Sequence, residues 1–221
     1  ASNSWQNGGK METNGLELAV GLNPTNLVEL GGLDWNMYMT YYTNESEVTE
    51  LTVDPYNYGG FATFLGTYRI EEGMSPTAIV GADYDADGNH IEIGNENPDY
   101  RFSLRNSFSF GPLSLSFLID HKEGGHAINL ANLIYDLGGT TADYEENGSR
   151  MSVLSGGSTA PYVESTTYTA LRDLSLTYAL PASLTEGYGL NNVQLGLALR
   201  NWWMASDYTG LSPEVSQFGN E

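Results

Sequence analysis

Apolar and polar residues alternate with a period of two along several parts of the chain, which predicts β-strands. The pattern covers residues 15–22, 33–43, 100–110, 113–121, 173–180 and 191–203. In the last of these segments small or polar residues occupy one face, and the other face carries Val193, Leu195, Leu197 and Leu199. The apolar face of residues 100–110 has one misfit, Asn106.

The medium that these apolar faces meet decides the fold class. A soluble sandwich buries them against a second sheet, whereas an outer-membrane barrel exposes them to lipid and places aromatic residues at the headgroup level. Each segment has about the 9–11 residues that a tilted strand needs to cross a bilayer, the fifth only if Leu171 and Arg172 are added. Trp202 and Trp203 close the last segment, where an interfacial belt is expected.

The connections between these segments alternate between short and long. Residues 23–32, 111–112 and 181–190 are short and rich in Pro, Gly and Asn, whereas residues 44–99 and 122–170 form long excursions. A compact soluble domain seldom carries two such excursions, but outer-membrane barrels combine short turns on one side with long extracellular loops. We therefore predict an all-β fold over residues 1–221, an antiparallel transmembrane β-barrel segment with long extracellular loops.

Local structure is also expected inside the long excursions. Residues 68–83 have the pattern of a hairpin. Residues 128–137 have helical spacing and are followed by Gly138 and Gly139, which is typical of a helix end.

The charge and composition exclude several classes of protein. The net charge is −20, with 8 Lys and Arg against 28 Asp and Glu, so nucleic-acid binding is not expected because it requires clustered cations. The chain has no cysteine, which excludes a disulfide scaffold and a thiolate metal site. No run of about 18 apolar residues is present, which excludes a transmembrane helix.

Residues 83–89 suggest a calcium site. Acidic residues stand at positions 1, 3 and 5 and glycine at position 6, the spacing that wraps oxygen ligands around Ca²⁺. The candidate ligands are Asp83, Asp85, Asp87, Asn89 and Glu92. The usual glutamate at position 12 is replaced by Gly94, and the alternative interpretation is an acidic turn exposed to solvent.

Other chemistry has weaker support. His90, His121 and His126 lack the spacing of a zinc site, and no G-x-S-x-G nucleophile motif is present, so the chain is not expected to be an enzyme. Charged residues on the polar side of the strands would face the lumen of a barrel, where they pair with one another, with a plug or with solute. These lumen-facing candidates are Glu17, Asp34, Arg101, Arg105, Asp120, Asp173 and Arg200.

Several segments resemble motifs of the SusC/RagA-type TonB-linked transporters of Bacteroidota outer membranes. Residues 68–76 (YRIEEGMSP) resemble a strand followed by a G-x-P loop, and residues 171–181 (LRDLSLTYALP) resemble L-R-x-x-S-L-x-Y-x-L-P. Residues 93–102, 108–125 and 206–216 are similar to further motifs, in the family's order. The resemblance covers residues 11–219.

The resemblance implies the C-terminal barrel region of such a transporter, without the plug or the last strand. It further implies energised uptake of glycans or peptides across a bacterial outer membrane, a SusD-like lipoprotein over the long loops, and TonB acting through the plug. The loop aromatics Tyr56, Tyr58 and Tyr135 are the candidate substrate-binding residues. Two alternatives stay open: a soluble or surface-assembled structural or adhesive β-protein, and a secreted glycan-binding enzyme whose acid pair the sequence does not place.

Overall fold

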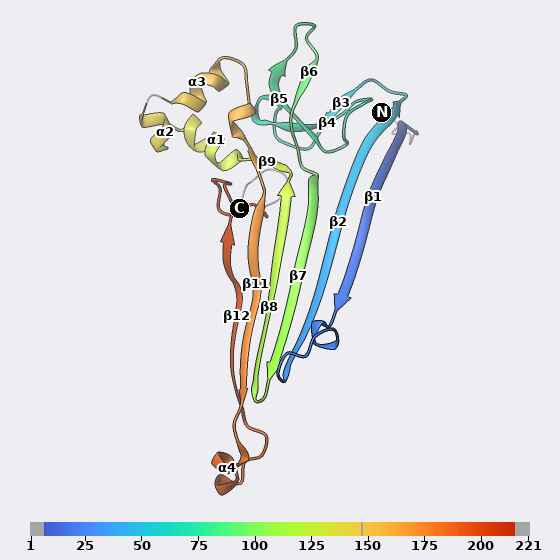
Figure 1. Ribbon diagram of the computed structural model, residues 1–221. Coiled ribbons are helices and arrows are strands. Elements are labelled where there is room, and N and C mark those ends of the chain that lie inside the picture. The colour runs from blue at the N-terminus through green and yellow to red at the C-terminus, as the bar shows by residue number, and fades with distance from the viewer. Residues whose placement is uncertain (1–6, 147, 215–221) are drawn as a thin grey trace, which may run out of the picture.

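A computed structural model describes residues 7–146 and 148–214. Its largest element is a six-stranded antiparallel sheet in which strands adjacent in the chain are adjacent in space (Figure 1). The strand order is β1 (Gly9–Leu22), β2 (Leu33–Leu51), β7 (Pro98–Phe110), β8 (Leu113–Gly124), β11 (Tyr168–Ala179) and β12 (Gln194–Ala205). The six predicted strands and the antiparallel all-β fold class are confirmed. Within the described residues the sheet is open, with β1 and β12 as its edges.

The register brings the apolar faces of all six strands together. One row of paired residues crosses the sheet through Val20, Met39, Leu104, Ile119, Leu171 and Trp203. The adjacent row, on the opposite face, runs through Ala19, Thr40, Ser103, Asp120, Ala170 and Met204. Because side chains alternate between faces with a period of two, one face is mainly apolar and the other is mainly polar.

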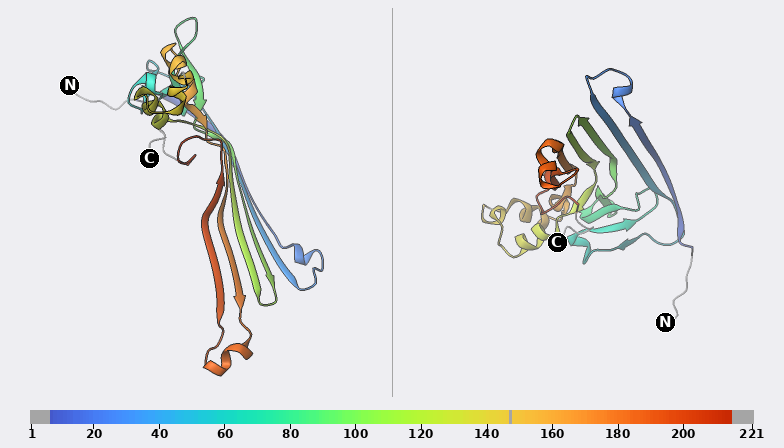
Figure 2. Two further views of the ribbon diagram at one scale, coloured as in Figure 1. Left: turned by 90° about the vertical axis from the view of Figure 1, so that its left-hand side faces the viewer. Right: turned by 90° about the horizontal axis from the view of Figure 1, so that it is seen from below.

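The apolar face has no second layer over it within the described part of the chain (Figure 2). Leu18, Leu195 and Leu197 are 49%, 59% and 57% exposed. A soluble protein rarely leaves an apolar surface of this extent open to water, whereas a barrel wall presents it to lipid. At the end nearer the long excursions this face carries Trp203, and Tyr41 stacks on Tyr100 with ring centroids 5.6 Å apart.

Asn106 lies on the apolar face, as its position in the alternation requires, yet its side chain is shielded. The Trp35 indole nitrogen donates a hydrogen bond to Asn106 Oδ1 at 3.0 Å. The Trp35 ring also stacks on Phe108 at 5.5 Å, and Asn106 is only 4% exposed. The amide therefore has its polar partner on the same face of the sheet.

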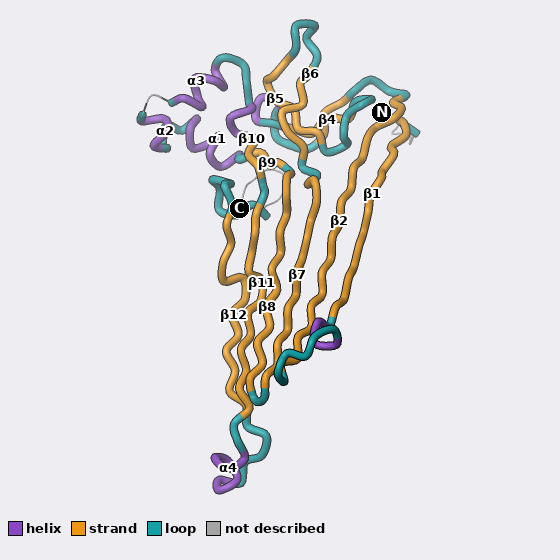
Figure 3. Tube along the Cα trace, viewed as in Figure 1, coloured by secondary structure: helices purple, strands orange, loops and turns teal. Residues whose placement is uncertain are grey.

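The short connections lie at one end of the sheet and the long ones at the other (Figure 3). The short connections contain η1 (Pro24–Asn26), the Gly111–Pro112 turn, α4 (Ala182–Thr185) and η4 (Glu186–Tyr188). The long connections span residues 52–97 and 125–167. The first begins later than the sequence pattern indicates because β1 and β2 remain paired as far as Gly9 and Leu51. The second begins later because β8 extends to Gly124.

Each long excursion has secondary structure of its own. The first forms a second sheet of β3 (Tyr56–Tyr58), β4 (Thr67–Ile70), β5 (Ala78–Tyr84) and β6 (His90–Asn95), with η2 (Thr63–Leu65) between β3 and β4. The expected hairpin at 68–83 is present, since Tyr68 pairs with Ile79. The second contains β9 (His126–Ile128), α1 (Leu130–Leu137), α2 (Ala142–Glu145), α3 (Ser149–Ser155), η3 (Ala160–Tyr162) and β10 (Val163–Ser165). Helix α1 ends at Leu137 and is capped by Gly138, as predicted.

The buried core lies between the two excursions rather than on the six-stranded sheet. Tyr68 and Ile79 of the first excursion pack against Ile128 and Leu130 of the second, and each is at most 3% exposed. Thr159 joins the same two segments, because its hydroxyl accepts a hydrogen bond from Ala82 N–H at 2.8 Å and donates one to the Phe64 carbonyl at 3.0 Å. The excursions therefore form one packed body. No helix among the described residues is long and apolar enough to span a membrane.

Candidate functional site

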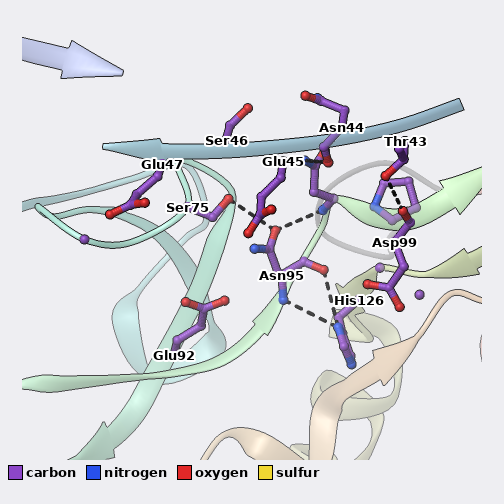
Figure 4. Close-up of a pocket in the computed structure, with 15 residues that line it drawn as sticks. Thr43, Asn44, Glu45, Ser46, Glu47, Ser75, Glu92, Asn95, Asp99 and His126 are labelled. Carbon is purple, nitrogen blue, oxygen red and sulfur yellow. Dashed lines mark hydrogen bonds between the residues drawn. The ribbon is translucent and has the colours of Figure 1, made fainter. Parts of the chain in front are cut away.

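A cavity of about 540 Å³ opens where β2 separates from its neighbour β7 (Figure 4). The two strands are paired as far as Tyr42 and Arg101. Beyond this point the next backbone–backbone hydrogen bonds of β2 on this side are at Val48, whose N–H donates to the Met74 carbonyl at 2.9 Å and whose carbonyl accepts from Gly73 N–H at 2.8 Å. Residues 43–47 of β2 therefore border the cavity without a neighbouring strand on that side.

Polar side chains fix the opposite rim. Asn95 Oδ1 accepts hydrogen bonds from the Thr77 hydroxyl at 2.6 Å and from Asn97 N–H at 3.0 Å. Asn97 in turn donates from Nδ2 to the Asn44 carbonyl at 3.0 Å, across the opening. The Thr43 hydroxyl donates to the Asp99 carbonyl at 2.7 Å. These bonds hold β2 and the β6–β7 segment at a fixed separation.

The cavity is acidic. Glu45, Glu47, Glu92 and Asp99 line it, and the lining residues include no Lys or Arg. Figure 4 shows Glu45 and Glu47 on the same side of β2, directed towards Ser75 and Glu92. Burial raises the pKa of Glu92, while its hydrogen bond to Asn95 and the nearby His126 act in the opposite direction. The site therefore suits a ligand with positive charge or many hydrogen-bond donors.

The predicted calcium ligands are not gathered around one point. Asp83 accepts hydrogen bonds from the Ser158 hydroxyl and from Thr159 N–H. Both oxygens of Asp85 accept from its own turn, from Asp87 N–H and Asn89 N–H at 2.9 Å each and from the Asn89 amide at 3.1 Å.

The hydrogen bonds from Asn89 lower the pKa of Asp85. Glu92 lines the cavity instead of this turn. The described part of the chain has no cluster of three His, Cys, Asp or Glu that could hold a metal. Calcium binding by residues 83–92 stays a prediction.

The candidate substrate-binding tyrosines lie apart, and none lines the 540 Å³ cavity. The Tyr58 hydroxyl donates to the Pro76 carbonyl at 2.7 Å, and its ring stacks on Tyr68 at 5.3 Å, which gives it a structural role. Tyr56 is on the same strand and is 48% exposed. Tyr135 is on α1 and borders a separate cavity of about 290 Å³. Their role in substrate binding stays a prediction.

The structure also shows functional candidates that the sequence pattern did not indicate. The cavity-lining residues Glu45, Ser46 and Glu47 fall in a segment expected to be a loop. Their alternation is polar on both faces, so the strand is not visible in hydrophobicity. Only the absence of Pro and Gly between residues 33 and 52 hinted that β2 continues.

The lumen-facing candidates share the polar face of the sheet. Tyr42 pairs with both Glu17 and Arg101, and Tyr38 pairs with Arg105, so these charges lie on one side. Arg200 and Asp173 are cross-strand partners with an N–O distance of 3.8 Å. Asp34 and Asp120 occupy the same face by the same register. That this face borders a lumen stays a prediction.

The chain after β12 folds across the upper part of the polar face. Arg172, at an irregularity in the pairing of β11, binds Asp120 at 2.8 Å and Glu214 at 2.5 Å. Lys122 donates to the Thr166 hydroxyl at 2.7 Å and to the Pro213 carbonyl at 3.4 Å. These contacts anchor residues 206–214 to the sheet.

An open antiparallel sheet with an uncovered apolar face, a polar opposite face and long connections at one end is typical of a β-barrel wall. Comparison with known proteins refines this class. No family model matches the chain. Over 97% of its length the chain is 25% identical to TonB-dependent receptor P26 of Formosa agariphila, and over 68% it is 27% identical to TonB-dependent receptor P3 of the same organism.

The fold also resembles solved structures of transporters. The RagAB peptide transporter matches 96% of the chain with a TM-score of 0.68 and 20% identity. The RagAB peptide importer in its closed-closed state matches 95% with a TM-score of 0.63 and 20% identity. The resemblance to SusC/RagA-type TonB-dependent transporters is thus confirmed. The chain spans 27% of receptor P26, 17% of receptor P3 and 27% of the RagAB chains. These relatives are named as receptors or transporters rather than as enzymes.

Proposed function

We propose that this chain forms part of the wall and the external loops of an outer-membrane TonB-dependent transporter that takes up glycans or peptides. The observation that carries the proposal is the apolar row that crosses all six strands without a covering layer, opposite a polar face. In a membrane the apolar face contacts acyl chains, and the polar face with its charged residues borders the lumen.

The partners follow from the edges and ends of the sheet. The free edges of β1 and β12 pair with the remaining strands of the barrel, because unpaired backbone groups are costly in lipid. A plug fills the lumen and transmits the pull of TonB, and a SusD-like lipoprotein covers the packed body formed by the two excursions. The structural likeness to RagAB supports this arrangement.

Uptake by cells tests the proposal. Cells carrying the full-length transporter are compared with cells lacking its gene and with cells lacking TonB, using labelled peptide and oligosaccharide mixtures. The proposal predicts that at least one mixture enters only when the transporter and TonB are both present. Equal uptake of every mixture in the three strains would contradict it.

A membrane-integration test separates this function from the soluble alternative. The full-length protein is expected in the outer-membrane fraction and is expected to resist extraction by alkaline carbonate. Recovery as a detergent-free soluble protein would favour the structural or adhesive β-protein.

A further inference from the structure

The β2 edge that borders the cavity has the geometry to accept another strand. The backbone of Val48 bonds to residues 73–74, and the carbonyl of Asn44 accepts from the Asn97 side chain, so the backbones of both residues point away from β1. Because backbone direction alternates along an antiparallel strand, the N–H and carbonyl of Ser46 point to the same side. The pairing of β2 with β7 ends at Tyr42, so no strand occupies this side at Ser46.

An unpaired strand edge of this kind binds extended peptides by main-chain hydrogen bonds. The cavity has room for one, since its volume of about 540 Å³ lies within the range of roughly 300–1,000 Å³ that is typical of ligand pockets. The rim is fixed by the hydrogen bonds of Asn95 and Asn97, so the edge is held open before a ligand arrives.

The charge of the cavity selects the side chains of such a peptide. Glu45 and Glu47 flank Ser46 on the same side of β2, about 6.8 Å apart along the strand. Side chains at alternate positions of an added strand have the same spacing, and opposite charges on neighbouring strands attract. Within the described part of the chain, Glu45, Glu47, Glu92 and Asp99 belong to none of the ion pairs. Their charge is therefore available to a basic ligand.

We propose that this cavity binds an extended peptide with basic side chains at alternate positions, which adds to the edge of β2 at Ser46. Because side chains alternate along a strand, Glu45 and Glu47 share the face of Met39 and Tyr41 rather than the polar face. The peptide therefore binds outside the predicted lumen, and this inference goes beyond the proposed transport function. It specifies peptides rather than glycans as the ligand, and basic peptides among them.

Binding to the purified full-length transporter in detergent tests the charge. The probes are a fluorescent pentapeptide with lysines at its first, third and fifth positions and an otherwise identical peptide with glutamates there. The lysine peptide is expected to bind and the glutamate peptide not to bind. The double variant Glu45→Gln, Glu47→Gln is expected to weaken lysine-peptide binding by about tenfold at low salt. The matched control Glu29→Gln, Glu186→Gln changes the same charge in the short connections and is expected to leave binding unchanged.

A modified peptide tests the main-chain contacts without altering the protein. Methylation of its central backbone amides removes the donors that pair with the β2 edge, and it is expected to abolish binding while retaining the lysines. On the protein, Ser46→Pro removes the N–H that faces the cavity, and Ser46→Ala controls for loss of the hydroxyl contact with Thr13. Ser46→Pro is expected to weaken binding and Ser46→Ala to retain it.

Two outcomes overturn the inference. Equal binding of the lysine and glutamate peptides would exclude charge selection, and undiminished binding of the methylated peptide would exclude addition to the strand edge. These assays measure binding to the purified protein, so either of these two outcomes can occur while TonB-dependent uptake persists. That combination would refute the peptide site and leave the proposed transport function intact.

Discussion

The hydrogen bond between Trp35 and Asn106 gives a quantitative test of how the apolar face is built. Trp35→Phe keeps an aromatic ring beside Phe108 but removes the indole donor, which leaves the Asn106 amide unpaired on an apolar surface. An unsatisfied buried polar group costs about 1–3 kcal/mol in soluble proteins, and hydrogen bonds between membrane-embedded side chains contribute about 0.6 kcal/mol on average and up to about 1.7. We expect a loss of about 1–2 kcal/mol, a factor of about 5–30 in the folding equilibrium.

A double-mutant cycle on the full-length transporter in lipid vesicles measures this coupling by urea unfolding. Asn106→Leu leaves the Trp35 indole N–H without its acceptor, so it is also expected to be destabilising. The double variant has lost both polar groups, so it is expected to cost much less than the sum of the two single variants. The difference is the coupling energy, expected at about 1 kcal/mol or more. Additive effects, with coupling below about 0.3 kcal/mol, would refute the reasoning.

Further predictions concern the excursions and the segment after β12. Asp136 is fully buried and accepts hydrogen bonds from Arg150, Thr141 and Tyr162, which lower its pKa although burial alone would raise it. Asp136→Asn is therefore expected to destabilise α1–α3 by about 1.5–3 kcal/mol, measured by hydrogen exchange. Because the folded-state pKa is depressed, this contribution is present above the unfolded value of about 3.9 and is lost as the pH falls through the folded-state value. If the contribution of Asp136 to the stability of α1–α3 did not change between pH 6 and pH 2, this assignment would be contradicted. Gly81→Ala places a Cβ atom 2.4 Å from Thr159, so it is expected to destabilise the junction of the two excursions by about 1–3 kcal/mol. The control Gly187→Ala, which has no heavy atom within 4 Å of the new Cβ, is expected to leave the stability of this junction unchanged. Arg172→Gln is expected to release residues 206–214 and to increase the mobility of a spin label at position 211. The control is Arg200→Gln, at an exposed arginine. Unchanged mobility in Arg172→Gln would show that other contacts hold the segment.

The six-stranded sheet was predictable because one physical constraint acts on every second residue. Lipid on one side and a polar environment on the other impose a period-two pattern, which located all six strands and placed even Asn106 on its correct face. The same reasoning failed for residues 44–51, which are polar on both faces. Their pairing with β1 is recorded only in the structure.

The cavity and the packed excursions could not be predicted for a different reason. Asp83 was expected to bind a metal because of its neighbours in sequence, but it bonds to Ser158 and Thr159, more than 70 positions away. Contacts of this kind depend on how two excursions meet, and no local pattern encodes that. Tyr58 shows the same limit, because its hydroxyl bonds to Pro76 on a turn of the same excursion.

The central claim is that the apolar face of the six-stranded sheet contacts lipid. Since the chain has no cysteine, single spin labels can be placed at Leu197→Cys on the apolar face and Thr177→Cys on the polar face, in a full-length transporter without other cysteines. In lipid vesicles the label at 197 is expected to collide mainly with dissolved oxygen, and the label at 177 mainly with a water-soluble nickel chelate. Comparable access of the chelate to both positions would show that the apolar face does not meet lipid.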